Sequence, residues 1–120
     1  MTKASRALLL EFHRIIENDV SDMLSAVTNI HLTERKGLLK LTNGEIEILR
    51  GINLSLEQQE TLRLALVELS RGIVFGILAI VDGVAFPESE DIPDLALVDR
   101  ETGNDIGDQF LHDEFYEVID

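Results

Sequence analysis

One apolar run most constrains how this chain folds. Ten uncharged residues extend from Gly72 to Val81, with Arg71 directly before them and Asp82 directly after. A helix that spans a membrane needs about 20 consecutive apolar residues. The run supplies half of that length between two charges, so we expect a core helix of a soluble protein and no membrane segment.

The helix that contains this run has a start signal upstream. The four residues from Ser55 to Gln58 read SLEQ, the pattern of a capping box in which the serine hydroxyl and the glutamine side chain satisfy free backbone N–H groups. We predict a helix from there to about Asp82, ended by Gly83. Because its second half is apolar all round, this helix must be covered on several sides.

Gly72 and Gly76 lie four residues apart in this apolar half. In a soluble domain such spacing permits close approach of another backbone, and in a membrane it favours helix pairing. We expect the former. Covering such a helix on all sides is demanding for one protomer of 120 residues. A helical homodimer with a structural or regulatory role is therefore an alternative interpretation of the sequence.

A second long helix is predicted from Ser5 to Ile30, with Asn29 as its stop signal. Its apolar residues recur at steps of three and four, which places them on one continuous stripe. The stripe consists of Leu8, Leu9, Phe12, Ile15, Ile16, Val20, Met23, Leu24, Val27 and Ile30.

The stretch from Leu38 to Leu49 predicts a β-hairpin. Asn43 and Gly44 are the favoured pair for a type I′ turn, because both central positions need positive φ. Pairing across that turn sets apolar residues opposite apolar residues and Lys40 opposite Glu47. The alternative is a short helix after Gly44, since the apolar residues there also recur every three positions.

Loop signals dominate the chain after Gly83. Residues 86–94 read FPESEDIPD, a solvated loop with two prolines. Leu95 to Val98 are a candidate strand, and a turn follows with Gly103 and Asn104 at its apex. Asp105 or Asp108 is expected to cap a final helix. The inward stripe of that helix is Leu111, Phe115 and Val118.

These signals together predict an α+β fold in a single domain, residues 1–120. Two long helices pack against each other, and a small antiparallel hairpin or sheet and a short C-terminal helix complete the fold. A chain of this length can bury one core. The chain has no cysteine, which excludes disulfides and thiolate metal sites and suits a cytoplasmic location.

The net charge of −13 is unevenly distributed along the chain. Residues 1–81 hold 10 acids and 9 bases, whereas residues 82–120 hold 13 acids and one base, Arg100. Such an excess repels nucleic acid and anionic lipid and attracts cationic partners. The alternative is that the acids only keep the domain soluble.

The acidic last third also contains apolar side chains, and this combination is what an interface against a basic protein needs. Charges accelerate the encounter, and apolar anchors hold the complex. The predicted partner-binding acids are Asp91, Asp94, Asp99, Glu101, Asp105 and Asp108, and the predicted anchors are Phe110 and Tyr116. In the alternative interpretation, all apolar residues of this third lie in the core.

Asp82 interrupts the apolar region and allows two interpretations. A partly buried carboxylate can be functional. More simply, it accepts hydrogen bonds from backbone N–H groups of the turn at Gly83 or the loop after it, with Arg71 or Arg100 as compensating cation. A third functional alternative, a small hydrolase-like enzyme, would use Asp82 together with His112.

We predict no catalytic site, metal or cofactor. Zinc sites need three or four converging ligands, whereas His13 and His112 each have only one acidic neighbour at helical spacing and His31 lies apart. The chain contains no phosphate-binding loop, no dinucleotide-binding glycine fingerprint and no nucleophile elbow.

A resemblance to a known class covers the chain from Leu66 to its C-terminus. The segment LVELSRGIVFGILAIVDGV, the acidic proline-containing loop and LHDEFYEVI look similar to small bacterial proteins of the immunity type. These are cytoplasmic antidotes encoded beside polymorphic or contact-dependent toxins. The resemblance implies a non-enzymatic inhibitor that binds a toxin domain, often a basic nuclease, and it assigns no binding residue.

Overall fold

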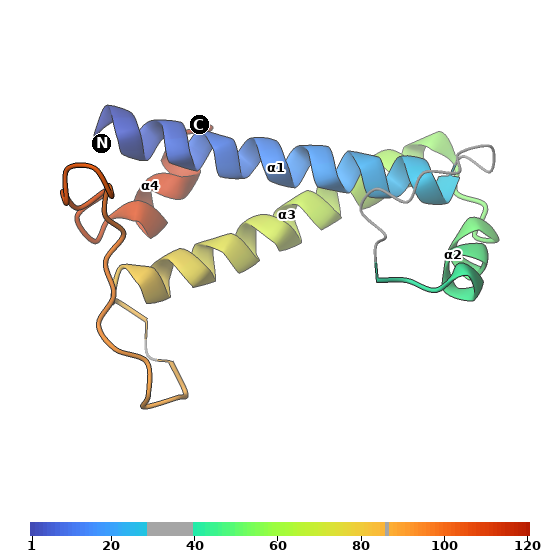
Figure 1. Ribbon diagram of the computed structural model, residues 1–120. Coiled ribbons are helices and arrows are strands. Elements are labelled where there is room, and N and C mark those ends of the chain that lie inside the picture. The colour runs from blue at the N-terminus through green and yellow to red at the C-terminus, as the bar shows by residue number, and fades with distance from the viewer. Residues whose placement is uncertain (29–39, 86) are drawn as a thin grey trace. The chain divides into compact units, whose positions relative to one another are not determined.

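A computed structural model of the protein describes residues 1–28, 40–85 and 87–120, and these ranges contain four helices (Figure 1). They are α1 (Lys3–Thr28), α2 (Asn43–Arg50), α3 (Leu56–Val81) and α4 (Leu111–Glu117). The chain divides into two compact units, one of Arg14–Ser70 and one of Met1–His13 with Arg71–Asp120. Each of the long helices α1 and α3 belongs partly to both units, and the single domain stays a prediction.

The two long helices lie where the sequence predicts them. Helix α1 contains the predicted apolar stripe, whose Leu9, Ile16, Val20, Leu24 and Val27 are buried. Its predicted C-terminal stop, Asn29, lies outside the described residues.

The start and the end of α3 also agree with the prediction. The Ser55 hydroxyl accepts a hydrogen bond from the Gln58 N–H at 3.1 Å, and the Gln58 side chain accepts one from the Ser55 N–H at 2.9 Å. This reciprocal pair is a capping box. At the other end Gly83 has a φ of 75° and donates its N–H to the carbonyl of Ile80, so the helix ends in the left-handed turn that glycine permits.

The predicted hairpin from Leu38 to Leu49 is wrong, because the described part of this stretch forms α2. A second capping box starts that helix: the Thr42 hydroxyl accepts from the Glu45 N–H, and the Glu45 carboxylate accepts from the Thr42 N–H at 2.8 Å. Asn43 and Gly44 therefore lie in the first helical turn. The short helix that the sequence left as an alternative is the one that forms.

The hydrogen bond from the Thr42 N–H, followed by that from its hydroxyl, lowers the pKa of Glu45 below its ordinary 4.5. A carboxyl whose folded-state pKa is depressed stabilises the fold above its ordinary pKa. That contribution is lost as the pH falls through the folded-state value.

The α+β class is a wrong prediction for the same reason. Among the described residues no strand forms, and the β structure consists of an isolated antiparallel bridge between Val98 and Asp105. The predicted strand from Leu95 to Val98 contributes only this bridge. A sheet needs a ladder of paired strands to be stable, and here helix-terminal hydrogen bonds satisfy the backbone instead.

In the unit Arg14–Ser70, the C-terminal half of α1, helix α2 and the N-terminal half of α3 bury one apolar cluster. Its buried members include Val20, Leu24, Ile46 and Val67. Arg50, at the end of α2, donates from Nε to the carbonyl of Ala26 at 3.0 Å. This bond attaches α2 to α1 and satisfies a carbonyl near the α1 C-terminus.

The other unit is organised around α4. Leu111 and Phe115 are the most deeply buried residues of this helix, and Val118 follows it on the same face. They lie with Leu9 of α1 and Leu78 of α3 among the core residues of the unit. The inward stripe that the sequence predicts for the final helix is confirmed.

Helix α3 is exposed to an unusual degree for its composition. It is long and apolar enough to cross a membrane, with a mean hydropathy of 2.1 over 18 residues, and only 11% of that window is buried within the protein. The expectation that this apolar helix is covered on several sides is therefore wrong within the described chain.

Two glycines with positive φ provide a test of how tightly α4 is held. A Cβ at Gly107 (φ 93°) would lie 2.5 Å from the side chain of Leu111, whereas a Cβ at Gly103 (φ 73°) would meet nothing within 4 Å. We expect Gly103→Ala to cost about 1 kcal/mol of unfolding free energy from backbone strain alone. Gly107→Ala should cost about 2–4 kcal/mol, because overpacking adds to that strain. Urea unfolding of both variants measures the difference, and equal costs would contradict the described packing of α4.

Candidate functional site

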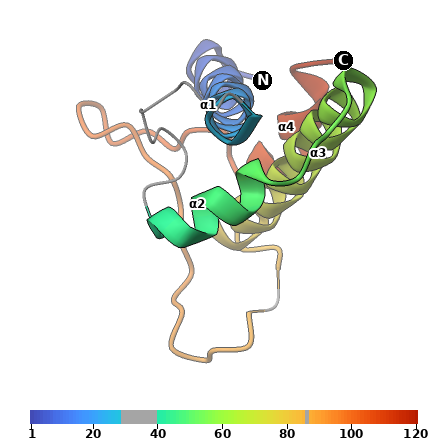
Figure 2. The same cartoon turned by 90° about the vertical axis from the view of Figure 1, so that its right-hand side faces the viewer.

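The candidate site is the acidic segment, which we define as residues 87–110, together with α4 behind it. In Figures 1 and 2 the segment is the orange chain that follows α3 and leads into α4. Its two ends are fixed by contacts of the flanking residues. These contacts determine how the predicted binding residues are presented.

Asp82 fixes the start of this region. Its carboxylate is 3% exposed, and its Oδ2 accepts from the backbone N–H of His112 at 2.8 Å and from the Nδ1 of the same residue at 2.6 Å. A negative charge at the N-terminal turn of α4 is also favoured by the helix dipole. The carboxylate therefore joins the end of α3 to the start of α4.

This finding corrects two predictions. Asp82 does accept from a backbone N–H, but the donor belongs to α4 and not to the turn at Gly83, and its partner is an imidazole and not Arg71 or Arg100. The predicted caps Asp105 and Asp108 are also wrong, because the N-cap residue of α4 is Phe110 and makes no side-chain cap. Asp82 supplies the missing acceptor from a distant position in the chain.

A second contact holds α4 from the side of α1. The imidazole of His13 stacks on the ring of Phe115, with centroids 4.0 Å apart, and its Nε2 donates to the carbonyl of Phe115 at 2.6 Å. His13 and Phe115 are both buried. Together with Asp82 this contact fixes both the first turn and the centre of α4.

The direct contact between Asp82 and His112 meets one condition of the hydrolase alternative, in which an aspartate orients a histidine base. The environment of the pair suits a structural role. The His112 ring lies edge-on to Phe75, with centroids 5.7 Å apart, and its Nε2 lies 3.4 Å from a carboxylate oxygen of Asp113. A base needs a reactive group at that nitrogen, whereas this histidine contacts an acceptor.

Five of the six predicted binding acids are exposed, and Asp99 is half-buried. Two of them shape the chain locally: Asp99 accepts from the Glu101 N–H at 2.9 Å, and Asp105 accepts from the Asp108 N–H at 3.2 Å. For the carboxylates of the other four, Asp91, Asp94, Glu101 and Asp108, the described chain provides no hydrogen bond and no ion pair. These four charges are available to a partner.

A tight turn presents the centre of the acidic segment. The Asp99 N–H donates to the Asn104 carbonyl at 2.8 Å, and the Ile106 N–H donates to the Leu97 carbonyl at 2.7 Å. Arg100 is the one base of this region and is exposed at the turn. Within residues 1–28, 40–85 and 87–120, no ion pair joins it to an acid.

Apolar side chains of the acidic segment are exposed beside these charges. Phe110 is 55% exposed, and Ile92, Leu95 and Val98 are each at least 40% exposed. The interpretation that every apolar residue of the last third lies in the core is therefore wrong, although it remains untested for Phe86, which lies outside the described residues.

The second predicted anchor has a different environment. Tyr116 is half-buried, and its ring lies 5.8 Å from that of Phe75 and 5.4 Å from that of Phe115, measured between centroids. Tyr116 therefore belongs to an aromatic cluster with Phe75 of α3 and Phe115 of α4. Phe110 is consequently the better candidate for direct insertion into a partner.

Three successive residues with positive φ connect the acidic segment to α4. They are Gly107 (93°), Asp108 (48°) and Gln109 (69°). For residues with a Cβ this conformation costs roughly 1–2 kcal/mol each. Burial of Leu111 and the hydrogen bond from the Phe110 N–H to the Gly107 carbonyl, 2.9 Å long, hold the turn. Apart from Gly107 itself, the sequence contains no signal for it.

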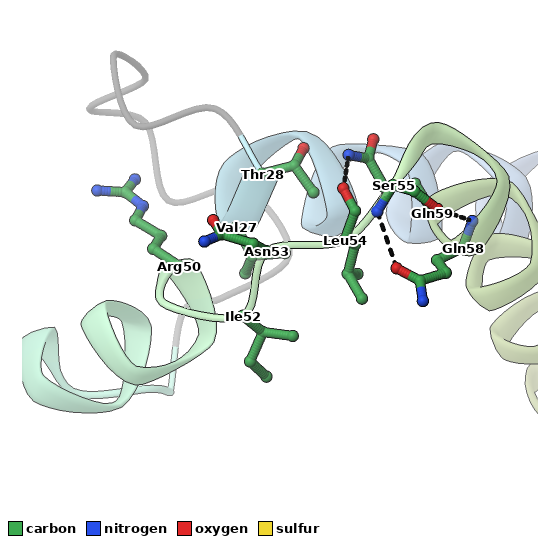
Figure 3. A pocket seen from close by; sticks show the side chains of 9 residues that line it. All are labelled: Val27, Thr28, Arg50, Ile52, Asn53, Leu54, Ser55, Gln58 and Gln59. Carbon is green, nitrogen blue, oxygen red and sulfur yellow. Dashed lines mark hydrogen bonds between the residues drawn. The ribbon is translucent and has the colours of Figure 1, made fainter.

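A cavity of about 440 Å³ lies in the unit Arg14–Ser70 and was not predicted (Figure 3). Polar groups surround it, but their hydrogen bonds are largely made within the chain. Ser55 and Gln58 bind each other, Gln59 donates to the Leu54 carbonyl, and Arg50 donates to the Ala26 carbonyl. The cavity therefore offers no cluster of free polar groups for a ligand.

Comparison with known proteins gives no match: no family model, no curated protein and no solved structure is significantly similar to this chain. The resemblance to immunity-type proteins thus stays a prediction. Within the described residues, no group of three or more histidine, aspartate or glutamate side chains is arranged to hold a metal ion. The candidate site is defined by the charges and apolar residues of the acidic segment.

The Asp82 contact can be tested by removing its acceptor. Asp82→Ala leaves the His112 N–H and Nδ1 without a partner in a buried place, and we expect a loss of about 3 kcal/mol in unfolding free energy. The control is Glu117→Ala, an exposed acid at the other end of the same helix, which should change the unfolding free energy by at most about 0.5 kcal/mol. Urea unfolding measures both changes in unfolding free energy. Similar changes in the two variants would contradict the role of Asp82 in joining α3 to α4.

Proposed function

We propose that this protein is a non-enzymatic binding protein whose acidic segment covers a basic surface of another protein. The observation that carries the proposal is the set of four exposed carboxylates, those of Asp91, Asp94, Glu101 and Asp108, for which the described chain provides no partner. Their neighbour Phe110 is an exposed aromatic side chain. Charges and an aromatic anchor thus occur in one segment.

The four carboxylates, Phe110 and the fixed ends of the segment have separate roles in binding. Unpaired carboxylates accelerate the encounter with a cationic partner and select against anionic ones. Phe110 contributes most of its energy only when a pocket of the partner removes it from water. The fixed ends of the segment, at Asp82 and at Leu111, lower the entropy that binding must remove.

The resemblance to immunity-type proteins suggests which partner to expect, a cytoplasmic toxin domain such as a basic nuclease. Covering the cationic surface with which a nuclease holds phosphates would inhibit it without any chemistry. A cytoplasmic location and the absence of enzymatic activity belong to the same proposal. The acidic segment would act as a competitor for the phosphate-binding surface.

The test compares two variants with the same net charge. In the first, Asp91→Asn, Asp94→Asn, Glu101→Gln and Asp108→Asn neutralise the unpaired acids. In the second, the same number of charges is removed outside the segment. The control substitutions are Asp19→Asn, Asp22→Asn, Glu117→Gln and Asp120→Asn.

The probe is a soluble peptide that combines arginine with tryptophan, and calorimetric titration measures its affinity. We expect the first variant to bind roughly tenfold more weakly than the wild type at low salt, a difference of about 1.4 kcal/mol, and the difference should shrink as salt screens the charges. The control variant should lose much less affinity for the peptide. Equal losses in the two variants would show that only net charge matters and would remove the proposed site.

A further inference from the structure

Helix α3 carries an uncovered apolar stripe, which we define as Leu62, Ala65, Leu69, Gly72, Ile73, Gly76 and Ile77. All seven residues are exposed. Leu69, Ile73 and Ile77 are 62%, 56% and 55% exposed. Large exposed side chains repeated along one helix face are uncommon in a monomer and mark an interaction surface.

The stripe is opposite the face with which α3 packs in its own chain. At 3.6 residues per turn, Val67 and Leu78 lie on the other side of the helix, and both are buried, at 3% and 4% exposure. Along the stripe, the positions Leu62, Ala65, Leu69, Gly72 and Gly76 follow alternating steps of three and four. That spacing is the seam of a helix pair.

The glycines of the stripe are open. A Cβ placed on Gly72 or on Gly76 would meet nothing within 4 Å. The sequence predicts that these glycines admit another backbone, and no other segment of the described chain occupies that place. The spaces at the glycines are bordered by Leu69 and the two isoleucines, so the same face offers both projections and recesses.

We propose that a second copy of this chain covers the stripe, with the two α3 helices antiparallel. An alignment centred between Ser70 and Arg71 places Leu69 opposite Gly72 of the other copy. In the same alignment Leu62 lies opposite Ala79, and Ala65 lies opposite Gly76. Each of these three layers pairs a residue with one of glycine or alanine, which gives a self-complementary seam of two-fold symmetry.

The seam residues select this orientation. A parallel pair would set Leu69 opposite Leu69 and Gly72 opposite Gly72, so projections would meet projections and recesses would meet recesses. The antiparallel pair sets Leu69 of each copy opposite Gly72 of the other.

Charge also favours a second copy over a lipid bilayer. The apolar window of α3 contains Glu68 and Arg71, and a charged side chain near the centre of a bilayer is costly. The residues on the opposite face, Val67 and Leu78, are already buried in the protein. A helix pair covers the stripe and leaves Glu68 exposed to water.

The first test uses sedimentation equilibrium of the full chain at micromolar concentration. The wild type should be a dimer. Ile73→Glu should weaken dimerisation at least tenfold, and the control Leu64→Glu, which changes an exposed leucine of α3 outside the stripe, should not. A wild type that is monomeric at 100 micromolar, or equal effects of the two variants, would overturn the proposal.

A further variant distinguishes close packing of the two helices from unspecific apolar association. Gly76→Leu adds apolar surface where the isolated chain has open space, so it should leave the unfolding midpoint of the monomer unchanged or raise it. Close packing predicts a dimer at least tenfold weaker. A stronger dimer would show unspecific apolar association and would contradict the glycine-mediated interface.

Orientation is tested by oxidation of single-cysteine variants, which the absence of native cysteine makes unambiguous. In the antiparallel pair Leu69→Cys lies near its own copy and should form a disulfide. Leu62→Cys should not, because the two copies are separated by about 25 Å along the axis, at 1.5 Å per residue.

Disulfides at both positions would indicate a parallel pair and overturn the antiparallel arrangement. Insertion of the wild type into phosphatidylcholine vesicles, read by cofloatation, would overturn the second copy as occupant. Because the stripe contains none of the acids proposed to bind a basic partner, each proposal can fail without the other.

Discussion

A buried carboxylate must be hydrogen-bonded, and in this protein the partners of Asp82 come from a helix that begins 29 positions later in the chain. The His112 N–H and Nδ1 bind one oxygen of Asp82, while Phe115 stacks on His13. These contacts position α4, and they also hold together the two ends of the acidic segment. The segment is therefore a closed loop, for which ordering costs less than for a free tail.

Patterns within one helix were predictable from the sequence. The periodicity of α1, the capping box at Ser55 and the inward stripe of α4 all appear as expected, because each depends on neighbours a few residues away. The hairpin failed although the decisive signal was present: Thr42 and Glu45 have the same spacing as Ser55 and Gln58. The capping box at Thr42 and Glu45 satisfies backbone N–H groups at the helix start, and it outweighs the turn preference of Asn43 and Gly44.

The candidate site was predictable only in part, for a physical reason. Composition locates the acids of residues 82–120 but does not show which carboxylates the fold uses. The exposure of Phe110, the use of Asp99 and Asp105 in turns, and the pairing of Asp82 with His112 all depend on tertiary contacts. The exposure of α3 was not predictable for a similar reason. An apolar helix must be shielded from water, but its sequence does not show which segment or which other molecule shields it.

The fixed position of α4 has a consequence for the integrity of the chain. Leu111 and Phe115 are buried, and Asp82 and His13 bind the helix by contacts that do not pass through the acidic segment. The chain between Pro87 and Leu97 therefore does not need to be intact for α4 to keep its position. A protease that cuts this exposed stretch would produce two fragments that remain associated under native conditions and separate only in denaturant.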